Sequence, residues 1–193
     1  DRDKTVPIFQ GDYAYHREFR EGGEQPIYLR HKLAGATLDE DTTDEVMLDV
    51  NSLARGHGFY EVSNWSVSSD QNLLAFTEDT VGRRQYKLRF KDIDSGLFLA
   101  DEISGVASSI AWAQDNKTVF YVRLDPQTLL PFQVYRHVLG TAVASDQLVY
   151  EESDRSFYTA VSTTRSNAFV VINLSSTDST EIRLIDSRQP ASP

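Results

Sequence analysis

The residues that could carry out acid–base or nucleophilic chemistry are few in this chain of 193 residues. It contains no cysteine, which excludes a thiolate nucleophile, a cysteine–zinc site and a disulfide framework. Its four histidines lie outside any metal-binding motif such as H-E-x-x-H: His16, His31, His57 and His137. We therefore expect no metal site and no cofactor, and we interpret the histidines as strand or turn residues.

A serine nucleophile of the hydrolase type requires G-x-S-x-G between a strand and a helix. The nearest match is G-V-A-S-S at residues 105–109, which has Ala107 in place of the serine and lacks the final glycine. None of the histidines belongs to a recognisable base–nucleophile motif. The sequence therefore predicts no catalytic residue in this chain.

Two charged clusters remain as candidate binding features. Arg83 and Arg84 follow Glu78 and Asp79 between two strand-like segments, which predicts a charged hairpin tip. Such a tip is either an interaction surface or a solvated turn with weak ion pairs. The second cluster lacks the ligand spacing and the turning glycine of a calcium loop, and we interpret it as a mobile surface loop. Its carboxylates are Asp39, Glu40, Asp41, Asp44 and Glu45.

The composition limits the class of partner. The formal net charge is -10, whereas proteins that bind nucleic acids need clustered Lys and Arg, so we expect no nucleic-acid partner. No apolar run approaches the roughly 18 residues of a membrane span, and no signal peptide is visible. We therefore expect no membrane partner and a cytoplasmic location. The chain begins with Asp1 rather than Met, which is typical of a cut or processed segment.

The elements that must position these residues recur along the chain. Arginines occupy the middle of three strand-like segments at a spacing of 47 residues, at Arg89, Arg136 and Arg183, and a further copy surrounds Arg30. A polar turn between two apolar strands precedes the repeated segments, and a short strand flanked by acidic residues follows most of them. Each unit thus holds four short strands, which is the signature of a β-propeller blade.

We predict an all-β fold, a partial β-propeller of about four four-stranded antiparallel blades in a single domain. The blade units span approximately residues 6–52, 59–104, 106–152 and 156–190. A generic β-sandwich would share much of this strand pattern. Because one small sheet cannot cover its own faces, stacked blades bury large side chains between them. The candidates for this role are Trp65, Phe76, Trp112, Phe120, Tyr121 and Phe169.

The repeated arginines have two possible roles. They either form a cationic array that binds anions, or they are structural and pair with carboxylates on neighbouring strands while their stems cover apolar surface. Of the two, we favour the structural role.

Long colinear segments of the chain resemble the propeller of the prolyl oligopeptidase family, in particular its oligopeptidase B (protease II) branch. The best matches are EDTVGRRQYKLRF at 78–90, IAWAQDNKTVFYVR at 110–123 and TLLPFQVYRHVLGT at 128–141. YAYHR at 13–17 and IYLR at 27–30 fit the first blade, so the resemblance covers nearly the whole chain.

The resemblance implies a seven-bladed propeller inserted into an α/β-hydrolase. That enzyme is a serine-type oligopeptidase that cleaves short peptides after Lys or Arg, and its propeller limits access by size. In the family the catalytic Ser, Asp and His lie C-terminal to the propeller. We therefore expect the catalytic hydrolase domain to be absent from this chain and the chain alone to be inactive. Its partner would be the hydrolase domain of the same parent chain, and short basic peptides would be substrates of the parent.

The resemblance also points to candidate site residues. It is strong at the hairpin tip, and Ala107 with Ser108 aligns approximately where prolyl oligopeptidase presents an aromatic side chain to its substrate. This departure fits a different specificity. The candidates for a domain interface or a substrate cavity are Glu78, Asp79, Arg83, Arg84, Ala107 and Ser108.

Two alternatives remain open. A free-standing propeller scaffold that binds partner proteins would close its ring, whereas an excised segment would expose apolar blade faces and self-associate through them. A dipeptidyl peptidase or acylaminoacyl peptidase relative would share the architecture but not the TVGRRQY run at 80–86.

Overall fold

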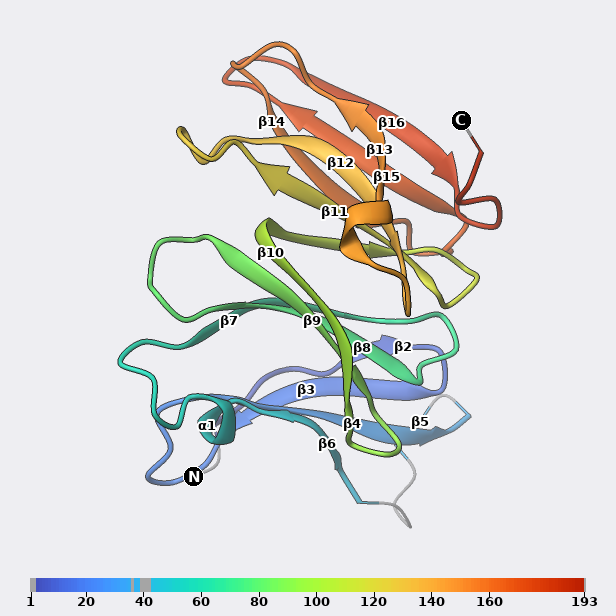
Figure 1. Ribbon diagram of the computed structural model, residues 1–193. Helices are drawn as coiled ribbons and strands as arrows, with labels where there is room; N and C mark the ends of the chain where they lie inside the picture. Colours follow the sequence, from blue (N-terminus) through green and yellow to red (C-terminus); the bar gives the residue numbers. More distant parts are fainter. Residues whose placement is uncertain (1–2, 36, 39–42, 193) are drawn as a thin grey trace. The chain divides into compact units, whose positions relative to one another are not determined.

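Antiparallel β-sheets account for nearly all the regular structure (Figure 1). The computed structural model describes residues 3–35, 37–38 and 43–192. Within those ranges the helical elements are the four-residue α1 (Val50–Leu53) and the 3-10 helix η1 (Val143–Ser145). The prediction of an all-β fold is confirmed. The chain divides into two compact units, residues 1–61 and residues 62–193.

The first unit is built on a six-stranded sheet in which β3 and β4 are the central strands. Tyr15, Leu29 and Met47 bury their side chains almost completely in its core. Apolar residues thus line the segments that the sequence predicts as strands. The strands are β1 (Asp3–Lys4), β2 (Ile8–Gln10), β3 (Tyr13–Phe19), β4 (Ile27–Ala34), β5 (Thr37–Leu38) and β6 (Glu45–Asp49).

The second unit contains a seven-stranded sheet whose strands follow one another in chain order from β7 to β13. A separate three-stranded sheet follows, in the order β14-β15-β16. The strands of the larger sheet are β7 (Glu61–Val67), β8 (Leu73–Asp79), β9 (Tyr86–Asp92), β10 (Phe98–Trp112), β11 (Thr118–Leu124), β12 (Pro131–Val138) and β13 (Gln147–Glu151). Those of the smaller sheet are β14 (Tyr158–Thr163), β15 (Phe169–Ser175) and β16 (Thr180–Asp186).

Strand β10 is 15 residues long and pairs with a different neighbour along each half. Its first half pairs with β9 and its second half with β11, and Val106 lies opposite residues of both neighbours. Between the halves, Gly105 has a φ of +73°, in the left-handed region that glycine adopts without steric cost. The strand therefore crosses the border between the predicted units 59–104 and 106–152. These two units share one continuous sheet.

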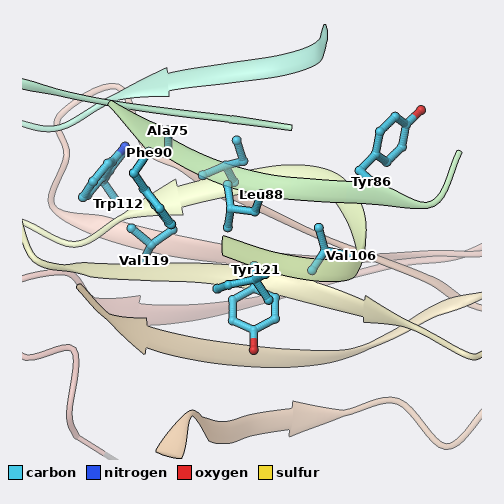
Figure 2. Close-up of a cluster of buried hydrophobic side chains, with 10 residues drawn as sticks. Ala75, Tyr86, Leu88, Phe90, Val106, Trp112, Val119 and Tyr121 are labelled. Atoms are coloured by element: carbon cyan, nitrogen blue, oxygen red, sulfur yellow. The ribbon is translucent and has the colours of Figure 1, made fainter. Parts of the chain in front are cut away.

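The two halves of the seven-stranded sheet enclose a common hydrophobic core (Figure 2). Its buried members come from β8, β9 and the first half of β10, and from the second half of β10 and β11: Ala75, Tyr86, Leu88, Phe90, Ile103, Val106, Ile110, Trp112, Val119 and Tyr121. A second cluster joins the β11–β12 region to the three-stranded sheet, with Phe120 and Val134 packed against Val170 and Ile172. The sheets are thus stacked through apolar layers, as blades require.

Three of the six large side chains predicted to fill these layers belong to these clusters: Trp112, Phe120 and Tyr121. Phe76, Phe120 and Tyr121 are fully buried, and Trp112 is 3% exposed. The prediction is wrong for Phe169, which is 38% exposed at the start of β15. Its position alternates with the buried Val170, so its side chain lies on the opposite face of the sheet.

The repeated arginines do not share one environment. Arg89 lies opposite Phe76, on the sheet face that points away from the core of Figure 2, where it pairs with Glu78 and Glu102. Arg136 lies opposite Phe120, on the side of the second cluster. A shift of one residue in strand register moves a side chain to the other face, so equal spacing along the chain does not give equal placement.

The predicted pairing of these arginines with carboxylates is confirmed for Arg89, which contacts Glu78 and Glu102. Arg30, in the further copy of the repeat, contacts Glu45 at 2.6 Å. Arg183 pairs with Glu181 on its own strand. The prediction is wrong for Arg136, whose guanidinium donates to the Pro190 carbonyl at 2.7 Å and to the side-chain oxygen of Gln147. Arg136 is therefore held by neutral oxygens.

Candidate functional site

The hairpin that links β8 and β9 is organised by the buried carboxylate of Asp79. Its two oxygens accept the backbone N–H groups of Val81, Gly82 and Arg84, each at 2.8 Å. The side chain of Asp79 is at the end of β8 and is 1% exposed. Burial alone would disfavour its ionised form, but the backbone donors outweigh burial and lower the pKa of Asp79 below its ordinary value of 3.8.

The turn of this hairpin uses two left-handed residues. Gly82 has a φ of +79° and Arg84 a φ of +56°. A side chain in that region costs about 1–2 kcal/mol, so the contact of the Arg84 N–H with Asp79 offsets a local strain. The three hydrogen bonds to Asp79 therefore stabilise the backbone conformation of the tip.

Glu78 is also withdrawn from the surface. Its side chain is 5% exposed and accepts a hydrogen bond from Arg89 at 3.2 Å. The Arg89 guanidinium also lies 4.5 Å from the centre of the Phe98 ring. Both predicted carboxylates of the tip are thus part of the supporting structure, and neither neutralises Arg83 or Arg84.

Arg83 and Arg84 are exposed at the tip. Within the described parts of the chain, neither guanidinium forms an ion pair with a carboxylate. Two adjacent cations without a carboxylate partner among the described residues therefore lie on a hydrogen-bonded turn, in a chain of net charge -10. The structure makes this hairpin a cationic tip, which we define as residues 79–85.

Ala107 and Ser108 lie in an irregular part of β10, where the pairing with β11 shifts between Val106 and Ile110. The carbonyl of Ser108 accepts hydrogen bonds from the Asn64 side chain at 3.0 Å and from the Thr77 hydroxyl at 3.4 Å.

Thr77 directly precedes Glu78 on β8, so Ser108 lies at the same end of the seven-stranded sheet as the cationic tip. The structure thus gathers the six candidates at one end of a single sheet. Ser108 is connected to the tip through β8.

Each histidine contacts another side chain that no local sequence motif predicts. His16 and His31 lie beside Asp44, at 3.3 and 2.9 Å, and His57 contacts the Tyr60 ring. His137 is fully buried between Asp101 and Asp146. These aspartates are 36 and 9 residues from His137 in the sequence, so only the pairing of strands brings them together.

The acidic segment before β6 is only partly described. Asp39, Glu40 and Asp41 lie outside the described residues. Asp44 contacts Lys4 and His31, and Glu45 contacts Arg30. In the described ranges, no group of three or more His, Asp or Glu side chains is arranged to hold a metal ion. Likewise, none of the helices in the described structure has the length and apolar character needed to cross a membrane.

A surface pocket of about 430 Å³ lies in the first unit. Its lining includes Asn51, Arg55, His57 and Tyr60 and none of the six candidates. A smaller pocket of about 190 Å³ lies beside His16, His31 and Asp44. Sequence patterns gave no signal for either pocket.

Comparison with known proteins extends over the whole chain. A family model described as the prolyl oligopeptidase N-terminal β-propeller domain matches residues 1–193. The chain is 38% identical to dipeptidyl aminopeptidase BI of Pseudoxanthomonas mexicana, over 97% of this chain and 27% of that protein. It is 33% identical to Protease 2 of Moraxella lacunata, over 100% of this chain and 28% of that protein.

A comparison with solved structures also covers nearly the whole chain. Oligopeptidase B from Leishmania major superposes with a TM-score of 0.89 at 29% identity, over 97% of this chain and 26% of that one. The chain thus spans little more than a quarter of the length of these relatives, at 26–28%.

Proposed function

This chain belongs to the N-terminal β-propeller domains of the prolyl oligopeptidase family, and we propose that it is the non-catalytic, access-limiting part of a serine-type oligopeptidase. The match of the family model over the whole chain carries this proposal. The parent enzyme cleaves short peptides after Lys or Arg, and its catalytic residues belong to a hydrolase domain outside these 193 residues. That hydrolase domain is the partner of the propeller.

Size selection follows from the rigidity of stacked sheets. The apolar cluster around Phe90 packs the two halves of the seven-stranded sheet together, and the cluster around Phe120 packs this sheet against the three-stranded sheet. Close-packed layers of this kind do not deform to admit a folded protein, whereas a short flexible peptide needs only a narrow entrance. A rigid cap over the active site therefore excludes folded substrates without contacting them specifically.

The cationic tip is proposed to contact carboxylates of the hydrolase domain. Arg83 and Arg84 are exposed and have no carboxylate partner among the described residues, while Asp79 fixes the backbone that carries them. Because the turn is already ordered, binding an acidic surface costs little additional backbone entropy. Ala107 and Ser108, at the same end of the sheet, are proposed to lie at the border of this contact.

A comparison of the 193-residue chain with the complete enzyme tests the proposed division of roles. We expect the chain to release no more fluorophore from an arginine-amidomethylcoumarin substrate than a heat-killed control. The complete enzyme should hydrolyse that substrate and short arginine peptides, and should leave the same site uncut within a folded protein. Reproducible hydrolysis by the chain alone that a serine-directed phosphonate blocks would contradict the proposal.

Substitution of both arginines tests the contact. In the complete enzyme, the double variant Arg83→Ala, Arg84→Ala should lower kcat/KM for a short arginine peptide by about threefold to tenfold, because an exposed ion pair contributes up to about 1 kcal/mol. This loss of kcat/KM should be smaller at high salt, because salt screens exposed ion pairs. Arg165→Ala, in the exposed turn between β14 and β15, is the matched control. Equal effects of the double variant and the control would refute a specific contact.

The alternative of a free-standing scaffold has less support. The proteins similar to this chain are peptidases, among them Protease 2 of Moraxella lacunata and oligopeptidase B from Leishmania major, and not free-standing scaffolds.

A further inference from the structure

His137, on β12, has both ring nitrogens at hydrogen-bonding distance from carboxylates. Its Nδ1 lies 2.7 Å from Asp146 Oδ1, and its Nε2 lies 2.9 Å from Asp101 Oδ1. The imidazole is 0% exposed, and the side chains of Asp146 and Asp101 are 2% and 9% exposed. The three groups form a buried cluster that the proposed peptidase function does not use.

Other groups around the cluster supply donors and an apolar surface. The Tyr121 hydroxyl donates to Asp146 Oδ2 at 2.7 Å, and the Gly140 N–H donates to Asp101 Oδ1 at 2.7 Å. The Phe90 ring stacks on the imidazole with an interplanar angle of 24°.

Tyr121 remains a donor to this cluster. Burial, and then its hydrogen bond to Asp146, raise the pKa of Tyr121 above its ordinary value of 10.0. Among the described residues, Arg123 is a further charged group near the cluster, and its guanidinium donates to the Tyr121 hydroxyl at 3.4 Å.

The charge of His137 depends on whether one or both nitrogens of its imidazole ring carry a proton. A neutral imidazole carries one N–H, so it can donate to only one of two ionised carboxylates. Its other nitrogen would then face a carboxylate oxygen with no proton between them, in a site where water cannot intervene. An imidazolium donates to both Asp101 and Asp146, and it neutralises one of the two buried negative charges.

The cluster joins two parts of the sheet that are paired with different strands. Asp101 lies in an irregularity of β10 between Phe98 and Glu102, in the half of the strand that pairs with β9. Asp146 follows η1 and precedes β13. We propose that His137, held as an imidazolium, is an ionic latch that fastens the Asp101 segment of β10 to the turn after β12.

The charge state can be measured directly on the unaltered chain. We expect a ¹H–¹⁵N correlation spectrum of ¹⁵N-histidine-labelled protein near pH 7 to show both nitrogens of His137 protonated. The same chain unfolded in urea gives the reference for an unconstrained ring. A folded spectrum with a single protonated nitrogen at His137 would overturn the proposal.

Variants test whether the latch holds the two segments. Asp101→Asn and His137→Gln should each speed hydrogen exchange at the Asp146 amide, which donates to the Val143 carbonyl, by on the order of a hundredfold, because removing one member of a buried ion pair leaves the others uncompensated. Glu102→Gln, at the exposed neighbour of Asp101, is the matched control and should change this rate little.

A double-mutant cycle separates the latch from general destabilisation. The effect of Asp101→Asn with His137→Gln together should be smaller than the sum of the single effects if the two side chains act on each other. Additive effects, or an equal effect in Glu102→Gln, would overturn the latch.

Discussion

Charged residues have different roles in the hairpin between β8 and β9. Asp79 is buried and holds the turn, whereas Arg83 and Arg84 remain exposed. The sequence predicts a charged tip correctly, but it does not predict which charges face solvent. A charge pattern alone does not distinguish a carboxylate that binds backbone N–H groups from one that points into water. The spacing of Asp79 and Gly82 is the signal that, with hindsight, indicates such a turn.

The turn makes the stability of the chain depend on pH through Asp79. Because the folded pKa of Asp79 lies below its unfolded value, the ionised carboxylate stabilises the fold above about pH 4, and this contribution is lost as the pH falls through the folded pKa. We expect Asp79→Asn to lower the free energy of unfolding by about 1–3 kcal/mol near pH 7. Urea denaturation measures this difference.

The pH profile supplies the control for that variant. The gap in unfolding free energy between the natural chain and Asp79→Asn should narrow as the pH falls from about 5 to about 2. A gap that stays constant over this range would mean that the charge of Asp79 does not stabilise the turn.

The strands and their order could largely be predicted, because apolar alternation and polar turns recur along the chain. Gln71 and Asn116, in the predicted turns, have φ values of +66° and +55°, as tight hairpins require. The continuity of β10 could not be predicted in the same way. The repeat predicts separate sheets on either side of residue 105. The shared strand instead follows from the pairing of β10 with β9 along one half and with β11 along the other.

A glycine substitution tests the bend in β10. Gly105→Ala should lower the free energy of unfolding by about 1–2 kcal/mol, because alanine is disfavoured at a φ of +73° although no atom lies within 4 Å of the added Cβ. Gly58→Ala is the matched control, since its Cβ also meets open space and its φ is outside the left-handed region. Thermal unfolding of both variants measures the difference. An equal decrease in the free energy of unfolding would show that the backbone conformation at residue 105 does not cause the loss of stability.

At the scale of the whole molecule, the family is indicated by resemblance over long segments. It is not indicated by residues that could be catalytic. The matches at 78–90 and 128–141 span strands and turns together, so they specify a blade rather than a single strand. The contacts of His137 with Asp101 and Asp146 could not be predicted from the sequence, because they depend on how the two halves of the seven-stranded sheet pack against each other.

The three-stranded sheet presents an apolar face on which the 193-residue chain is expected to self-associate. Ile182 and Leu184 on β16 are 61% and 57% exposed, opposite Asn173 and Val171 on the face away from the second cluster. Ile182→Lys with Leu184→Lys should shift the chain toward monomer in sedimentation velocity, because charges on an open sheet face oppose stacking.

A substitution elsewhere provides the comparison for this prediction. Val81 is 67% exposed at the cationic tip, and Val81→Lys should leave the sedimentation profile unchanged. A natural chain that is monomeric at all concentrations, or an equal response to Val81→Lys, would refute association through β16.

The shared strand β10 has a mechanical consequence for any enzyme that contains this propeller. The β7–β9 and β11–β13 regions cannot separate without breaking the hydrogen bonds of a strand that belongs to both. Among the described strands, none is shared by the sheets of β13 and β14, where the chain passes from one sheet to the next through residues 152–157. Separating these two sheets would break side-chain packing and no shared strand, so we expect the junction at residues 152–157 to open before the junction at β10.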